Sequence, residues 1–131
     1  MKTLCTVHAI AQKTDGKIII LQRAESRSHP GAWNCITGHI KECESAENAA
    51  LRELKEETNL TGDIVKTTKP FWKDVGDIRW IIVASLISVN QPNDLKIDRS
   101  ESQDYKWVNP DEDIVKTSEA LTLSLKNLEL I

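Results

Sequence analysis

Three glutamates near the end of a helix-forming segment have the spacing best suited to chemistry in this chain. Glu53, Glu56 and Glu57 stand at i, i+3 and i+4, so on a helix their carboxylates fall within about 100° of arc on one face. Like charges at these spacings repel each other, and the last turn of a helix disfavours anions. The pattern leaves two interpretations open: a solvated acidic face, or a site for a hard divalent cation such as Mg²⁺, which prefers oxygen ligands.

The excess negative charge of the protein lies in the same region. The chain has 131 residues and a formal net charge of −3. Residues 38–60 hold six acidic and three basic side chains, for a net of −3, whereas the other 108 residues carry equal numbers of each. A pI near 5.6 argues against binding to duplex DNA, which selects proteins with a basic face.

The residues around the glutamates follow a long pattern of fixed spacing. Gly38 precedes Glu44 by six positions, and Glu44 precedes Arg52 by eight. This run resembles the Nudix box, Gly-x5-Glu-x7-Arg-Glu-U-x-Glu-Glu-x-Gly-U, in which U is aliphatic, and it matches eight of the nine specified positions. Asn59 replaces the last glycine. Because Asn is the usual substitute for Gly in the left-handed residue that ends a helix, we expect the helix to end normally there.

The resemblance to the Nudix family extends over roughly residues 4–128. Ile19–Arg23 resembles the strand before the family's substrate loop, Gly31–Trp33 resembles its aromatic approach to the box, and Glu101–Pro110 resembles the strand that follows the central sheet. The resemblance implies a single domain over residues 1–131. Its fold would be a Nudix-type α/β (α+β) sandwich, with a mixed central β-sheet between helices.

The activity implied by the resemblance is hydrolysis of a diphosphate linkage with Mg²⁺ or Mn²⁺ as cofactor. By motif position, Glu53, Glu56 and Glu57 would hold the metal, and either Glu53 or Glu57 would activate water. Glu44 would be an auxiliary metal ligand or would hold its loop onto Arg52. A metal would also explain how an acidic site binds an anionic substrate, because the cation neutralises charge on the phosphate oxygens.

Other residues of the resemblance would support catalysis or contact substrate. Arg52 would orient the carboxylates through charge-assisted hydrogen bonds. Glu101 would supply an extra metal ligand or a general base, or it is an exposed turn residue. Arg27 is open between a phosphate contact and solvation. The candidates for direct contact with substrate are Arg23, Trp33, Gly38 and His39.

The tryptophans could stack on the base of a substrate, although burial is their commoner fate. Trp33 follows Gly31 in a loop beside the box, which favours contact with a ligand. Trp72 stands at the edge of a turn and is open between the two roles. We expect Trp80 and Trp107 in the hydrophobic core.

The run from Ile36 to His39 departs from the Pro-Gly-Gly of many family members. With Trp33 upstream and the segment from Glu101 to Trp107 downstream, it resembles the dihydroneopterin triphosphate and dATP pyrophosphohydrolase branch. The implied reaction converts a nucleoside or pterin triphosphate to the monophosphate and pyrophosphate. Two alternatives stay open: another diphosphate substrate (ADP-ribose, a dinucleoside polyphosphate or the 5′ end of RNA), and a non-catalytic nucleotide-binding module on the same fold.

Strands and helices must position these residues. Alternating or apolar runs predict strands over residues 4–11, 18–22, 64–71, 78–89 and 104–108, with a turn at 74–77. The Ala-, Leu-, Glu- and Lys-rich segment from Ser45 to Thr58 predicts the helix that carries the glutamates. Asn109 followed by Pro110 and acidic residues predicts the start of another helix, and a last helix is expected over residues 118–128.

The rest of the sequence narrows the class of protein. The first residues lack the pattern of a signal peptide, and no apolar run approaches the ~20 residues of a membrane helix, so we expect a cytoplasmic protein that binds no membrane. Cys5, Cys35 and Cys43 are odd in number and lack Cys-x-x-Cys spacing, which favours free thiols. A small phosphorylated molecule, such as a nucleotide, is the expected partner. Monomer and homodimer both stay open.

Overall fold

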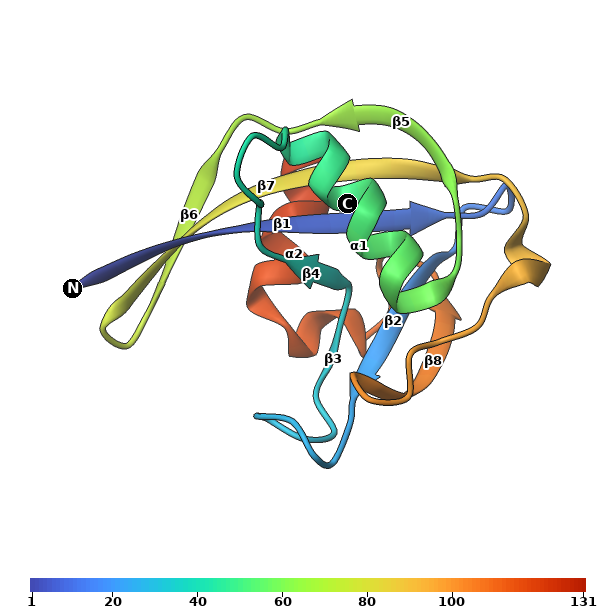
Figure 1. Ribbon diagram of the computed structural model, residues 1–131, viewed down its shortest axis with the longest axis horizontal. Coiled ribbons are helices and arrows are strands. Elements are labelled where there is room, and N and C mark those ends of the chain that lie inside the picture. The colour runs from blue at the N-terminus through green and yellow to red at the C-terminus, as the bar shows by residue number, and fades with distance from the viewer.

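Two long parallel strands form the centre of the sheet. In the computed structural model, which describes residues 1–131, β1 (Lys2–Gln12) and β7 (Ile78–Val89) pair along their whole length, from Lys2 opposite Ile78 to Gln12 opposite Ser88. Figure 1 shows them side by side in blue and yellow. Both strands are rich in Ile, Val and Ala, as is typical of strands covered on both faces.

The remaining strands pair antiparallel around this centre. The sheet order is β3-β2-β1-β7-β5, with β4 also paired to β1, β6 to β7 and β8 to β2. The sheet is therefore mixed, as predicted. The bounds of these strands are β2 (Ile18–Arg23), β3 (Trp33–Asn34), β4 (Ile36–Gly38), β5 (Gly62–Thr67), β6 (Phe71–Val75) and β8 (Ser102–Val108).

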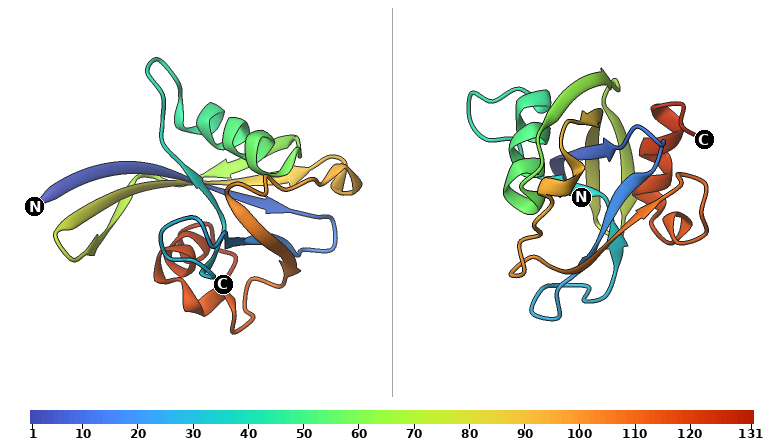
Figure 2. Two further views of the ribbon diagram at one scale, coloured as in Figure 1. Left: turned by 60° about the horizontal axis from the view of Figure 1, so that its bottom comes forward. Right: turned by 90° about the vertical axis from the view of Figure 1, so that its right-hand side faces the viewer.

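Helices cover both faces of the sheet. α1 (Ala46–Thr58) lies on one face and α2 (Glu119–Asn127) on the other, as the left view of Figure 2 shows. On β1, Ala9 and Ala11 belong to the core beneath α1, whereas Ile10 belongs to the core beneath α2. This is expected because side chains alternate between the two faces of a strand. The two cores confirm the predicted sandwich.

The ends of α1 follow the local signals in the sequence. The Ser45 side chain accepts a hydrogen bond from the Asn48 backbone N–H, which is the usual N-cap arrangement. Asn59 has φ 62° and ψ 6°, the left-handed conformation predicted for this position, and its backbone N–H bonds to the Lys55 carbonyl. The helix thus ends immediately after the glutamates.

Three local predictions were wrong or incomplete. The segment predicted as one strand over 64–71 belongs to two strands, β5 and β6. The hairpin between β6 and β7 turns at Gly76. The short strands β3 and β4 were not predicted, because they have too few residues to show a period. No helix begins at Asn109: a 3₁₀ turn, η2 (Val115–Thr117), follows, and α2 begins at Glu119. The β-branched residues of residues 114–117 disfavour a helix, and Val115 is buried in the core beneath α2.

A second 3₁₀ turn, η1 (Pro92–Asp94), follows β7. None of the helices is both long enough and apolar enough to span a membrane.

Candidate active site

Arg52 organises the acidic residues of α1 and the loop before it. Its Nε donates to Glu44 Oε2 at 2.8 Å, and its Nη2 donates to Glu44 Oε1 at 2.9 Å and to the His39 carbonyl at 2.9 Å. Its Nη1 donates to Glu53 Oε1 at 2.8 Å and to Glu56 Oε2 at 3.3 Å. Arg suits this role because its planar fork offers five donors in a fixed geometry.

The two oxygens of Glu44 are therefore both used by Arg52. Oε1 also accepts from the Lys41 backbone N–H at 3.0 Å. The hydrogen bonds from Arg52 and Lys41 lower the pKa of Glu44 to about 2. Of the two roles the sequence leaves open for Glu44, this geometry corresponds to holding the loop onto Arg52.

Glu57 differs from Glu44 in its hydrogen bonding. Its Oε2 is buried and has no hydrogen-bond partner. Burial is the largest cause that raises the pKa of Glu57 to about 9, together with the nearby carboxylates of Glu53, Glu101 and Glu56 and a hydrogen bond with Glu53. A buried carboxylate without a donor is unfavourable unless a cation or a proton compensates it.

Gly38 is positioned by the closeness of β4 to α1. A Cβ built on Gly38 would lie 2.2 Å from the Glu53 carboxyl carbon, so only glycine fits beside this side chain. The Gly38 carbonyl accepts from Thr6 Oγ1 at 3.0 Å, and β4 pairs with β1 through Val7 opposite Gly38. The backbone thus approaches a candidate metal ligand, in the place where the sequence suggested an approach to phosphate or metal.

The carboxylates of α1 fit a hard cation in their chemistry. The protein donates to Glu53 and Glu56 through Arg52 alone, at one oxygen each, and the buried oxygen of Glu57 has no donor. Each of the three side chains therefore keeps an oxygen that no protein N–H occupies. They do not converge in a ready-made cluster of three ligands, and Arg52 donates to both Glu53 and Glu56. Carboxylate oxygens are the donors that Mg²⁺ and Mn²⁺ prefer.

Glu101 reaches this group from a loop bound to the end of α1. The backbone N–H groups of Lys96 and Asp98 donate to the Thr58 and Glu57 carbonyls, each at 2.9 Å. These bonds satisfy carbonyls that the last turn of a helix leaves free. The loop brings Glu101 close enough to affect the pKa of Glu57. Arg27 forms an ion pair with Glu101 at 3.2 Å.

A polar cavity of about 410 Å³ gathers most of the residues singled out in the sequence. It has no hydrophobic lining, and it combines the carboxylates with basic side chains. The predicted residues that line it are Arg23, Arg27, Gly38, His39, Arg52, Glu53, Glu56, Glu57 and Glu101. Thr37, Lys41 and Asp98 also line it, and nothing in the sequence singled them out, because the fold alone brings them beside the helix.

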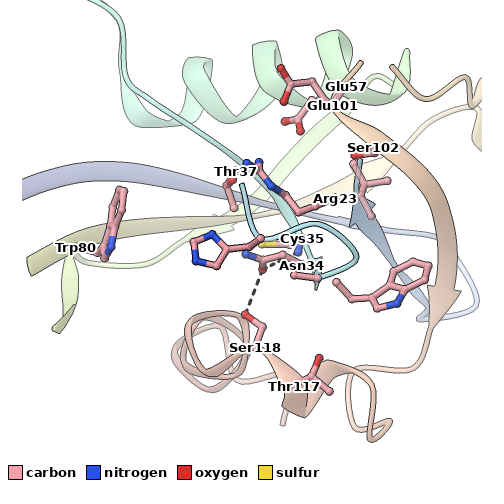
Figure 3. A pocket seen from close by; sticks show the side chains of 14 residues that line it. Arg23, Asn34, Cys35, Thr37, Glu57, Trp80, Glu101, Ser102, Thr117 and Ser118 are labelled. Atoms are coloured by element: carbon pink, nitrogen blue, oxygen red, sulfur yellow. Dashed lines mark hydrogen bonds between the residues drawn. The ribbon is translucent and has the colours of Figure 1, made fainter. Parts of the chain in front are cut away.

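A second cavity of about 420 Å³ adjoins the first, since Arg23, Thr37, Glu57 and Glu101 line both. Figure 3 shows this cavity, with Glu57 and Glu101 at the end nearest α1. Trp33 lines it, as the sequence indicated, and the Lys106 ammonium lies 5.1 Å from the Trp33 ring centroid. The second cavity has the aromatic walls typical of a site for an organic group.

The structure corrects one expectation about the tryptophans. Trp80 was expected in the core but lines the second cavity (Figure 3), since this part of β7 extends beyond the residues covered by the helices. Trp107 does pack against the core beneath α1. Trp72 is 62% exposed and stacks with Arg79, at 5.4 Å from the guanidinium to the ring centroid; it lines none of the cavities.

Arg23 donates hydrogen bonds to Ser28 through Nε and Nη2. These bonds hold it at the junction of the two cavities.

Comparison with known proteins identifies the family of this chain. The family model described as the NUDIX domain matches residues 3–122. Nucleoside triphosphatase NudI of Escherichia coli is 31% identical over 133 residues, which cover 88% of this chain and 92% of that protein. RNA pyrophosphohydrolase of Sphingopyxis alaskensis is 45% identical over 51 residues, or 39% of this chain. The matching region spans 31% of that protein, and 19% of another curated relative.

The fold is shared with solved structures. The MutT NUDIX hydrolase from Burkholderia pseudomallei has a TM-score of 0.80 over 98% of this chain and 99% of that one, at 16% sequence identity. The mixed sheet between two helices is therefore the Nudix fold. The chain belongs to the Nudix hydrolase family, enzymes that act on acid anhydrides.

Proposed function

We propose that this protein is a Mg²⁺-dependent nucleoside triphosphate pyrophosphohydrolase that releases a nucleoside monophosphate and pyrophosphate. The observation that carries the proposal is the continuity of the two cavities. A carboxylate-rich cavity opens through Arg23 and Thr37 into one with tryptophan in its walls. A triphosphate would lie in the first and its base in the second. The likeness to the nucleoside triphosphatase NudI supports this class of substrate.

Glu53, Glu56 and Glu57 are the proposed metal ligands. Mn²⁺ is expected to replace Mg²⁺, because both prefer oxygen ligands. When bound, the cation would neutralise charge on the phosphate oxygens and make water a better nucleophile. Glu44 is proposed to act through Arg52, because Arg52 uses both of its oxygens.

Glu57 is the proposed base. Glu53 accepts a hydrogen bond from Arg52 Nη1 at 2.8 Å, so one of its oxygens is already occupied, whereas Glu57 has a buried oxygen without a donor. Water would attack a phosphorus atom of the bridge between the α- and β-phosphates and give its proton to Glu57. The bond from that phosphorus to the bridging oxygen breaks, and the nucleoside monophosphate and pyrophosphate separate, the one that was not attacked keeping the bridging oxygen. Glu101, from the loop side, is a supporting ligand or base.

The basic side chains around the polar cavity are proposed to hold the phosphates. Arg23 lies at the junction of the cavities, and His39 and Lys41 lie at the other side of the site beside Gly38. Arg27 would leave Glu101 to meet a phosphate, since an exposed ion pair contributes little stability. Trp33 would stack on the base.

A panel of diphosphate compounds tests the proposal. The purified protein is given nucleoside triphosphates, deoxynucleoside triphosphates, dihydroneopterin triphosphate, ADP-ribose, a dinucleoside tetraphosphate and 5′-triphosphate RNA, in Mg²⁺ and in Mn²⁺, and the released pyrophosphate and orthophosphate are measured. Pyrophosphate from free triphosphates is the expected product. Preference for the pterin or dATP would place the chain in that branch, and faster release from RNA would favour an RNA 5′-end activity. Binding without any release would favour a non-catalytic module.

A further inference from the structure

The loop between β2 and β3, residues 24–32, carries side chains that line both cavities. Arg27 lines the polar cavity, Ala32 lines the second cavity, and Arg23 at the start of the loop lines both. The loop closes on Arg23, whose backbone N–H donates to the Ala32 carbonyl at 2.8 Å and whose carbonyl accepts from the Gly31 N–H at 3.1 Å. The position of these side chains therefore depends on what attaches the closed loop to the rest of the site.

A bulge in β8 brings Gln103 to this loop. The pairing of β8 with β2 passes from Asp104 opposite Gln22 directly to Ser102 opposite Arg23. Gln103, between these two pairs, therefore has no partner residue on β2. Such bulges re-aim a side chain and are frequent beside active sites. Figure 1 shows β2 and β8 beside each other, with the loop leaving the end of β2.

The Gln103 amide attaches the loop to β8. Its Nε2 donates to the Arg23 carbonyl at 2.8 Å and to Glu25 Oε1 at 3.1 Å. Carbonyl and ionised carboxylate oxygens can only accept, so the amide nitrogen must face them, and both of its hydrogens are used. The Gln103 carbonyl accepts from Arg99 Nη1 at 2.6 Å. The bulged residue is therefore held on both sides, by its backbone and by its side chain.

Two further contacts join the loop to the turn of Glu101. The Ala24 backbone N–H donates to the Glu101 carbonyl at 3.0 Å, and Arg27 Nη2 lies 3.2 Å from Glu101 Oε2. The two side chains of this ion pair are 45% and 34% exposed, and such pairs contribute little stability. The turn of Glu101 is itself bound to the end of α1 through the Asp98 N–H. Loss of the Gln103 contacts would therefore loosen the loop and leave Glu101 in place.

We infer that Gln103 is a positioning residue, which holds Arg23 and Arg27 at the polar cavity by attaching their loop to β8. This inference rests on the proposed function for the nature of the substrate, whose phosphates these two arginines would contact. Gln103 lines neither cavity, so it acts through the loop and not on the substrate. Loss of binding that is equal in the ground state and the transition state raises KM and leaves kcat unchanged.

The first test is Gln103→Leu, which removes the amide and keeps a side chain of similar size. The KM for GTP should rise about three- to tenfold, as the loss of one or two hydrogen bonds allows, while kcat changes less than about twofold. Trypsin gives a readout besides activity, because it cleaves after Arg23 and Arg27 in this loop. Cleavage there should be faster in Q103L than in the wild type, since a loosened loop opens more often.

Gln12 offers a matched control. Its Nε2 also donates to a backbone carbonyl, that of Gly16 at 3.0 Å, in the turn between β1 and β2. Neither Gln12 nor Gly16 lines the two cavities. Q12L should therefore lose a comparable hydrogen bond with an unchanged KM and an unchanged rate of cleavage after Arg27.

The contact between Gln103 and Glu25 can also be inverted. Q103E places a carboxylate opposite the carboxylate of Glu25 and should raise KM at least as much as Q103L. In the double variant Q103E/E25Q, the amide stands on the loop and can donate to the carboxylate on β8, so part of the loss in KM should be recovered. Recovery of this kind would not follow from a general loss of stability in β8.

Three results would overturn the inference: an unchanged KM in Q103L, an unchanged rate of tryptic cleavage in Q103L, or the same changes in Q12L as in Q103L. If the wild type releases no pyrophosphate from any triphosphate, the proposed function fails. Tryptic cleavage and GTP binding, measured by tryptophan fluorescence, would then still decide the role of Gln103. If the wild type and Q103L release pyrophosphate with equal KM and are cleaved equally, the proposed function stands and the role of Gln103 fails.

Discussion

At the scale of single residues, the site contains one arginine that satisfies several acids and one acid with a buried oxygen that no residue satisfies. Arg52 binds Glu44, Glu53 and Glu56, whereas Glu57 keeps a buried oxygen without a donor. A cation would remove this unfavourable burial. This buried oxygen without a donor is therefore the feature from which a bound cation is inferred, and the first prediction follows from it.

Mg²⁺ should stabilise the wild-type protein and not E57Q. A ligand that binds only the folded state raises the free energy of unfolding, so the melting temperature of the wild type should rise by several degrees at saturating Mg²⁺. Glu57→Gln replaces a proposed ligand with a neutral amide of similar shape, so its melting temperature should respond little to Mg²⁺. E42Q, an exposed residue of the same acidic segment, is the control and should respond like the wild type. An undiminished response in E57Q would show that Glu57 is not a ligand.

Arg52→Lys should destabilise the protein more than Arg79→Lys does. Lys cannot reproduce the two parallel hydrogen bonds to Glu44 or reach the other acids at once, so a loss of about 1–3 kcal/mol in the free energy of unfolding is expected. Arg79 also forms a paired contact with a carboxylate, that of Asp74, but both side chains are about 40% exposed. Such an exposed pair contributes little to stability. Urea unfolding measures both, and equal losses would contradict a special role for Arg52.

The residues of the acidic group were predictable because their spacing along one helix is local. The pattern around Glu53, Glu56 and Glu57 identifies the family, and their shared face follows from helix geometry. Trp80 was placed in the core from the sequence, because no local pattern marks its exposure to the second cavity. That exposure depends on how distant elements pack, which is decided by contacts far apart in the chain.

At the scale of elements, α1 holds the site because both of its ends are fixed. Ser45 caps the start, and Asn59 closes the end in the left-handed conformation. The loop at residues 96–98 binds the last carbonyls of the helix and carries Glu101 toward Glu57. The position of Glu101 therefore depends on the end of α1 being well formed.

Asn59 offers a test of this helix end. Ala has no access to the left-handed region without strain, so Asn59→Ala should lower the free energy of unfolding by about 1–2 kcal/mol. Asn59→Gly should be nearly neutral, because Gly adopts this conformation freely. Urea unfolding of the two variants beside the wild type measures the difference. A loss in N59G as large as that in N59A would mean that the Asn side chain, which donates to the Asp94 carbonyl at 3.1 Å, matters more than the backbone conformation.

Most long elements were predictable, whereas the short ones were not. β1, β2, β7 and α1 have clear periods or composition, and their predicted bounds agree with the structure within two residues. β3 and β4 are two and three residues long and are defined by their pairing with distant strands. The capping signal at Asn109 was misleading because helix formation also needs residues that favour the following turns.

At the scale of the whole molecule, the two-sided sandwich buries an ionisable group on the face of the sheet opposite the acidic helix. His8 of β1 is 3% exposed, and its Nδ1 lies 2.8 Å from Ser124 Oγ of α2. Burial lowers the pKa of His8 to about 4. The packing of α2 on the sheet is therefore coupled to pH.

The protein should lose stability in acid through His8. Above about pH 6.5, His8 is neutral in both the folded and the unfolded chain. Between pH 6.5 and 4, the unfolded chain binds a proton that the folded protein does not, so the free energy of unfolding falls as pH falls, by up to about 3 kcal/mol. Chemical unfolding of the wild type and H8Q across this range measures it. The difference in stability between the two should change in favour of H8Q as pH falls, and a difference independent of pH would contradict the assignment.

The uneven charge distribution along the chain corresponds to a position in the folded molecule. The net charge of −3 lies within residues 38–60, and the structure places three of the six glutamates of this segment, Glu53, Glu56 and Glu57, at one end of a continuous pair of cavities. An acidic protein can bind a triphosphate there because a cation would stand between the two sets of negative charges.

The most direct test of the central claim is a product measurement on the wild type and E57Q in parallel. Each protein is incubated with GTP and Mg²⁺, and nucleoside monophosphate, pyrophosphate and orthophosphate are quantified over time. The account predicts one monophosphate and one pyrophosphate for each GTP consumed by the wild type, and a rate at least about 10²-fold lower for E57Q, in line with the loss of a general base. Release of orthophosphate as the primary product, or an E57Q rate equal to that of the wild type, would contradict it.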